Sequence, residues 1–96
     1  MQRNDIPTLQ DAIRALHQCD SVHVKSVPVR EMLQGKVAWE GTVEIFDLPG
    51  CAAASRAYGW NYRDGSEVKS TIVLDLPPVN SARTAVQVTI TSKTRQ

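Results

Sequence analysis

The middle of the chain consists of four segments in which apolar and polar residues alternate with a period of two. This period is typical of β-strands with one buried face. Glycine, proline and aspartate separate the segments, and these residues favour turns. The segments cover residues 21–30, 37–48, 57–62 and 68–76. The pattern therefore predicts a sheet of four short-linked strands, which is most simply an antiparallel meander.

Helical patterns flank the four segments. Thr8 is a candidate N-cap, and the apolar residues after it recur at helical spacing, so the sequence predicts a helix over residues 9–18. Near the other end, Pro77-Pro78 and then Asn80 or Ser81 form a helix entry before residues 82–90. These last residues also alternate as a strand would, but the entry favours a helix.

Together these elements predict an α+β fold in the order α-β-β-β-β-α. The 96 residues of the chain allow one domain, residues 1–96. We expect a two-layer sandwich in which both helices cover one face of a four-stranded antiparallel sheet. The other face is then expected to be wet, because polar residues occupy the alternate positions.

Two details of strand pairing can be predicted. The alternation changes phase near Ser26, which indicates a β-bulge, and Pro28 indicates an edge strand because proline cannot donate to a ladder. In the second hairpin, a three-residue Arg63-Asp64-Gly65 loop would pair Trp60 with Val68 and Tyr58 with Ser70. This register places apolar residues of both strands on one face.

Charge and composition exclude several classes of protein. Eleven Lys and Arg residues nearly balance ten Asp and Glu residues, which argues against a nucleic-acid binder. No apolar run is long enough to span a membrane, and the first residues lead into no apolar stretch, so we expect a cytoplasmic protein. Cys19 and Cys51 are then expected to be free thiols.

The candidates for catalysis are few. Cys51 follows Pro49-Gly50 and precedes three alanines, so its sulfur could lie at the start of a helical turn that lowers a thiol pKa. His17 or His23 could serve as its base if the fold brings them together. The alternative is that Cys51 is a small apolar residue in a tight connection. A separate set of metal donors, His17, Cys19 and His23 with Asp20, lies near the end of the first helix, but its spacing matches no recurrent zinc site. The sequence therefore predicts no metal, no cofactor and no committed catalytic residue.

Glu40 and Glu44 lie four residues apart on one strand face. That spacing is about 13 Å at about 3.3 Å per residue, which is too far for a hydrolytic pair of carboxylates. We expect both to lie on a solvated face.

Aromatic residues provide a candidate binding surface. Tyr58, Trp60 and Tyr62 alternate on one strand, with Trp39 on another strand and Arg63 at the turn. Such residues can line a ligand pocket or contact a partner, although a small core could also absorb them.

Parts of the sequence resemble small single-domain bacterial proteins that have no assigned activity. The resemblance lies in WEGTVEIFDL at 39–48, AYGW at 57–60 and LPPV at 76–79. It implies a bacterial protein, encoded on a mobile element, and no particular activity. The element order also resembles a double-stranded-RNA-binding domain in outline, but residues 80–85 lack the lysine cluster of that domain.

The functional hypothesis is a non-enzymatic interaction module that self-associates as a dimer and binds a protein or another macromolecule. Small size favours this hypothesis, because association supplements a limited core. The alternative is a small-molecule binding protein or a minor enzyme with an aromatic pocket between the sheet and the helices.

Overall fold

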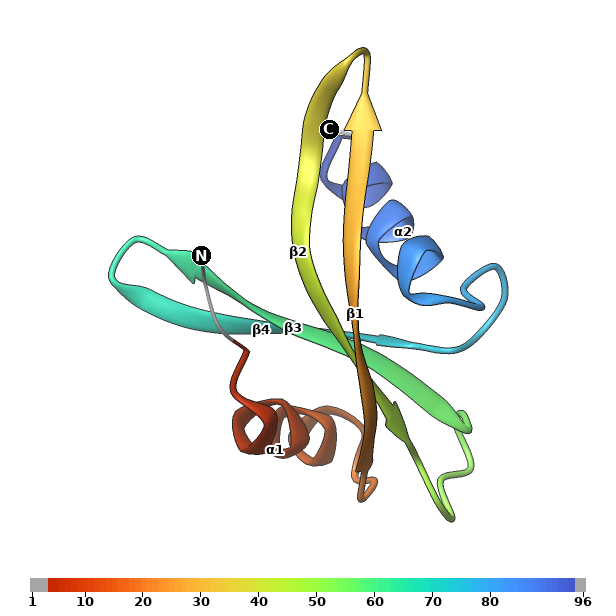
Figure 1. The fold of residues 1–96 in the computed structure, drawn as a ribbon. Coiled ribbons are helices and arrows are strands. Elements are labelled where there is room, and N and C mark those ends of the chain that lie inside the picture. The colour runs from red at the N-terminus through yellow and green to blue at the C-terminus, as the bar shows by residue number, and fades with distance from the viewer. Residues whose placement is uncertain (1–3, 95–96) are drawn as a thin grey trace.

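The computed structural model describes residues 4–94 and contains a four-stranded sheet with two helices. Figure 1 shows the six elements along the chain. They are α1 (Ile6–His17), β1 (Val22–Leu33), β2 (Lys36–Asp47), β3 (Arg56–Asp64), β4 (Glu67–Leu74) and α2 (Ala82–Thr94). The strands are antiparallel and lie side by side in the order β1-β2-β3-β4. The predicted α+β class, the element order and the antiparallel meander are confirmed.

Both helices begin at side-chain caps. The N-cap of α1 is Asp5, whose Oδ1 accepts a hydrogen bond from the Thr8 amide at 3.3 Å. The helix thus begins three residues before the predicted start at residue 9, because aspartate caps as well as threonine does. At α2, the Ser81 hydroxyl accepts from the Thr84 amide at 3.2 Å, and the predicted helix after Pro77-Pro78 is confirmed.

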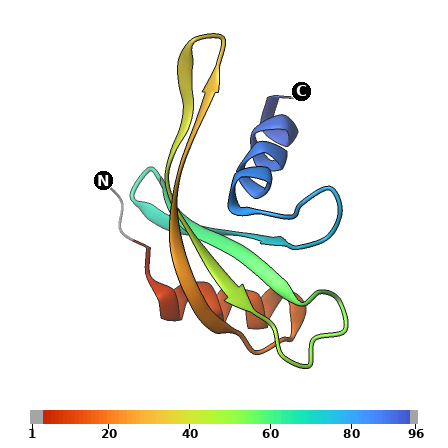
Figure 2. The same ribbon diagram turned by 45° about the vertical axis from the view of Figure 1, so that its right-hand side comes forward.

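The prediction that both helices cover one face of the sheet is wrong. Phe46 packs in a cluster with Leu9 of α1, whereas the preceding residue, Ile45, packs in a second cluster with Val86 of α2. Neighbouring strand residues point to opposite faces, so α1 and α2 lie on opposite sides of the sheet. The two views show this arrangement, with the β1–β2 hairpin next to α2 and the β3–β4 hairpin above α1 (Figures 1 and 2).

Each helix finds an apolar surface because β2 and β3 carry apolar residues on both faces. In β3, Tyr58 and Trp60 point toward the α2 side, and Ala57 packs on the α1 side. Gly59 is also on the α1 side, where a Cβ atom would lie 2.9 Å from the Ile72 side chain. The absence of a side chain at this position lets α1 approach the sheet.

The predicted register of the second hairpin is wrong for the same reason. Trp60 pairs with Thr71 and Tyr58 pairs with Val73, so the connection is Gly65-Ser66 rather than three residues. The prediction assumed that all apolar residues of β4 share one face. In the structure Ile72 packs toward α1 and Val73 toward α2, so alternation alone could not fix the register.

The first strand is an edge strand, as Pro28 predicts. Its register shifts between His23 and Lys25, which places the extra residue at Val24, two residues before Ser26, so the predicted bulge in this stretch is confirmed. A second shift lies between Glu31 and Met32. Bulges of this kind bend a strand and increase its twist.

Candidate functional site

Polar side chains form a network on the α1 side of the sheet, around two buried residues. Its centre is Glu44 on β2, which is only 4% exposed. The carboxylate accepts hydrogen bonds from Asn4 Nδ2 and His23 Nε2, each at 2.8 Å, and from the Ser26 hydroxyl. The donors come from β1 and from the segment before α1. Glu44 therefore joins three parts of the chain.

A second buried residue, Asn61 on β3, extends the network to the fourth strand. Its Nδ2 lies 2.8 Å from the Ser70 hydroxyl, and its Oδ1 accepts from the Asp5 amide at 2.6 Å. The backbone N–H of Asn61 donates to Asn4 Oδ1 at 2.8 Å. The segment that leads into α1 is thereby fixed to the sheet at two points, at Glu44 on β2 and at Asn61 on β3.

The surroundings of Glu44 lower the pKa of its carboxyl group. Burial by itself raises the pKa, but the hydrogen bonds from Ser26, Asn4 and His23 and the charge of His23 together outweigh it. Glu44 is therefore an anion at neutral pH, and its negative charge is shared among three donors.

The arrangement of Glu44, His23 and Ser26 differs from a catalytic triad. In a triad the serine donates to a histidine that removes its proton. Here Ser26 donates to the carboxylate, and His23 contacts the same Oε1 atom. A carboxylate with a lowered pKa is a weak base, so this geometry does not activate the hydroxyl. The network holds the chain together and offers no nucleophile.

Acid is expected to weaken the fold through Glu44. Its pKa in the folded protein lies below the ordinary value of 4.5. The stabilisation is therefore complete above about pH 4.5 and is lost as the pH falls through the folded pKa. Urea unfolding at a series of pH values should show this decrease, and Glu44→Gln should show a smaller one. Parallel pH profiles for the two proteins would contradict the assignment.

The prediction that Glu40 and Glu44 share a solvated face holds for one of them only. Glu40 is exposed and pairs with Arg30 at 2.8 Å, whereas Glu44 is buried. The reason is that α1 and the segment before it cover the part of this face that carries Glu44, but not the part that carries Glu40. The sequence contained a signal for this, since Phe46 lies on the same face as Glu44 and needs a cover of its own.

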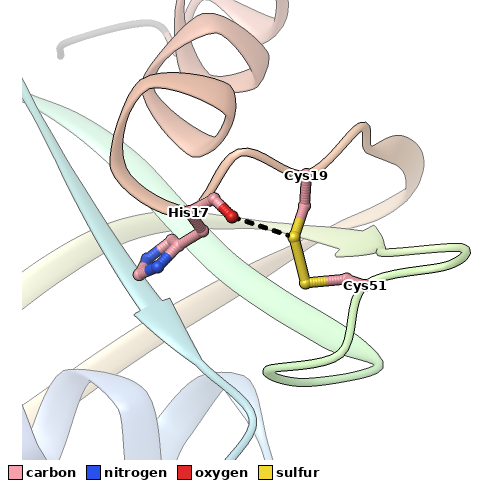
Figure 3. Close-up of a disulfide and its surroundings, with 3 residues drawn as sticks. All are labelled: His17, Cys19 and Cys51. Atoms are coloured by element: carbon pink, nitrogen blue, oxygen red, sulfur yellow. Dashed lines mark hydrogen bonds between the residues drawn. A yellow bond between two sulfur atoms is a disulfide. The ribbon is translucent and has the colours of Figure 1, made fainter.

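The two cysteines form a disulfide between the end of α1 and the loop after β2 (Figure 3). Their Cα atoms are 5.5 Å apart. The expectation of free thiols is wrong in this structure, because the fold brings Cys19 and Cys51 within bonding distance. A disulfide sulfur is not a thiolate, so Cys51 is no nucleophile in this state. The residues after Cys51 form no helical turn either.

The histidines do not assemble around Cys51. The Cys19 sulfur lies 3.2 Å from the His17 carbonyl oxygen, and the His17 ring points away from the disulfide (Figure 3). His23 lies on β1, where it contacts Glu44 and packs against the Phe46 ring at 5.4 Å. Within residues 4–94, no three His, Cys, Asp or Glu side chains gather as a metal site would require.

Most of the predicted aromatic surface gathers around one small pocket. The Trp39 and Trp60 rings meet edge to face with their centroids 5.3 Å apart. With Tyr62 and Arg63 they line a pocket of about 190 Å³. This is smaller than the usual volume of a ligand site. Trp60 is buried, so its ring is mainly part of the hydrophobic core.

Tyr58 lies elsewhere, at a cleft of about 350 Å³ between the sheet and the start of α2. It is 2% exposed, and burial raises the pKa of its hydroxyl. Asp75 raises this pKa further, and Arg56 partly opposes the rise. The tyrosine hydroxyl therefore stays protonated at neutral pH.

The fold and the site define a small α+β protein with a helix on each side of an antiparallel sheet and a buried polar network. Comparisons with family models, with curated proteins and with solved structures give no match for this chain. In the part of the chain that the structure describes, neither helix is long and apolar enough to cross a membrane.

Proposed function

We propose that this protein is a non-enzymatic interaction module that self-associates through the outer edge of β4. In the proposed dimer, the β4 strands of two copies pair antiparallel and join two sheets into one of eight strands. The observation that carries the proposal is the state of this edge: it is open, regular and uncharged over five residues.

The open hydrogen-bonding groups of β4 can be assigned from its pairing. The Asp75 amide donates to the Arg56 carbonyl oxygen at 2.9 Å, so Asp75 points toward β3. Successive residues of a strand point their N–H groups to opposite edges. The amides directed away from β3 therefore belong to the alternate residues Val68, Ser70, Ile72 and Leu74. No described strand pairs with them.

The contrast with the other edge supports β4 as the interface. Natural edge strands avoid pairing with other proteins by means of proline, charged side chains and bulges. The β1 edge carries all three, namely Pro28, Lys25 and the shift at Val24. In β4, residues 70–74 contain no proline and no charge, and their register with β3 is continuous.

The sequence of β4 is compatible with pairing to itself. A two-fold axis at Ile72 places Ser70 opposite Leu74 of the second copy, and outward amides meet outward carbonyls. The same axis places Thr71 opposite Val73 of the second copy, and both are uncharged β-branched residues. Such cross-strand pairs contribute roughly 0.2–1 kcal/mol each.

Size-exclusion chromatography with light scattering tests the proposal. We expect the wild-type protein to have twice the mass of one chain. Ser70→Pro removes one outward amide at the interface without removing a backbone hydrogen bond to β3, although it loses the hydroxyl contact with Asn61. This variant is expected to be monomeric with an unchanged circular dichroism spectrum.

Ser70→Ala is the matched control, because it also loses the hydroxyl contact with Asn61 but keeps the amide. It is expected to remain a dimer. A wild-type monomer at every concentration up to the solubility limit would overturn the proposal. A dimer that persists in a folded Ser70→Pro variant would place the interface elsewhere.

The disulfide bears on where such a module works. Disulfides persist in oxidising compartments and are rare in the cytosol. The Cys19–Cys51 bond therefore supports an oxidising location for the folded protein rather than the cytoplasmic one expected from the sequence. Alkylation of free thiols before cell lysis, followed by mass measurement, distinguishes the two states.

A further inference from the structure

We propose that the cleft between β1, β2 and the start of α2 binds a small organic carboxylate with an apolar body. This site is separate from the β4 edge, and the inference does not depend on self-association. It rests on the volume of the cleft, on the charge of its rim and on the chemistry of its floor.

The cleft has the size and lining of a small-ligand site. Its volume of about 350 Å³ lies in the range that holds small molecules. The floor is apolar and is formed by Val27, Val29 and Ile45, with the buried ring of Tyr58 at one side. An apolar body of a ligand would cover these groups and gain the free energy of removing them from water.

The rim of the cleft is basic. Three cations, Lys25, Arg56 and Arg83, line it, and none of the lining residues is acidic. The start of α2 is also at the rim, where the helix end adds partial positive charge. The cations come from β1, β3 and α2, so the fold brings them together from distant parts of the sequence.

Two of these cations already have acidic neighbours, which sets the charge of the ligand. Arg56 contacts Asp47 through Nε at 3.3 Å, and Arg83 contacts Glu31 through Nη1 at 3.2 Å. Both pairs leave guanidinium N–H groups for a further acceptor, because arginine has five donors. Lys25 has no ion pair with a described residue, so its single positive charge is the one left for a ligand.

This charge balance favours a monoanion over a phosphate dianion. A carboxylate also suits the planar guanidinium groups, which recognise it through two parallel hydrogen bonds. A buried tyrosine hydroxyl beside Arg56 can donate to the same anion, because its raised pKa keeps it protonated. The site is thus matched to a carboxylate attached to an aromatic or branched apolar group.

Nuclear magnetic resonance titration with benzoate tests the site. Benzoate is expected to shift the amide signals of residues 25–29 and 81–83 with a saturating curve. Benzamide, its neutral isostere, and inorganic phosphate are expected to bind at least about tenfold more weakly, since one charged hydrogen bond is worth about that factor.

Lys25→Met removes the unpaired charge and is expected to weaken benzoate binding about tenfold. Lys36→Met is the matched control, because Lys36 is exposed at the hairpin turn and lies outside the cleft lining. Both lysines are exposed, so both variants should fold. Equal binding by the two variants, equal shifts with benzamide, or shifts that never saturate would each overturn the proposal.

Discussion

Loss of the Cys19–Cys51 disulfide is expected to lower the free energy of unfolding by about 3–4 kcal/mol. The two residues are 32 positions apart, and closing a loop of that length restricts the unfolded chain by about this amount in the chain-entropy model. A domain of this size has a total stability of roughly 5–15 kcal/mol. The bond therefore accounts for a large share of the stability of the fold.

Urea unfolding of the double variant Cys19→Ala, Cys51→Ala measures the effect. The wild-type protein in excess reductant is the control, because it lacks the bond and keeps both sulfur atoms. We expect both samples to unfold at a similar urea concentration, well below that of the oxidised protein. If all three samples unfold together, the bond does not stabilise the fold.

The sequence predicts the elements of this fold well, because each element depends on local patterns. Alternation defines the four strands, Pro28 identifies an edge, and the Pro77-Pro78 entry separates helix from strand. These features involve neighbours in the chain, and the structure confirms them. The start of α1 is the exception, since Asp5 and Thr8 both cap well.

The arrangement of the elements was harder to predict, because it depends on which surfaces cover one another. The meander left two choices for each helix, and the alternation in β2 suggested one wet face. The prediction of a solvent-exposed face is wrong at Phe46 and Leu48, because both are buried against α1. The alternation did not show that α1 covers this second face. For that reason the predictions of an exposed Glu44 and of the register at Trp60 are both wrong.

The cleft and the disulfide could not be predicted because their residues are distant in the sequence. Lys25, Arg56 and Arg83 meet only when α2 packs across β1 and β2. Cys19 and Cys51 meet only when α1 packs under the sheet, which puts the end of the helix next to the loop after β2. Both follow from the placement of the helices on opposite faces.

Replacement of Glu44 by alanine is expected to lower the free energy of unfolding by about 1.5–3 kcal/mol, the usual cost of losing hydrogen bonds to a charged group. Asn4, His23 and Ser26 would lose their common acceptor on the covered side of the sheet. The loss should also release the start of α1, because Asn4 connects Glu44 to β3. Faster amide exchange in residues 6–10 would report this release.

Glu40→Ala is the matched control, since Glu40 lies on the same strand and the same face. Its pair with Arg30 is exposed on both sides, and such pairs contribute at most about 1 kcal/mol. We therefore expect two identical substitutions, four residues apart, to differ several-fold in effect. Similar losses of stability in the two variants would mean that the buried network contributes no more than a surface ion pair. The difference between them measures what the cover of α1 adds to a carboxylate on this sheet.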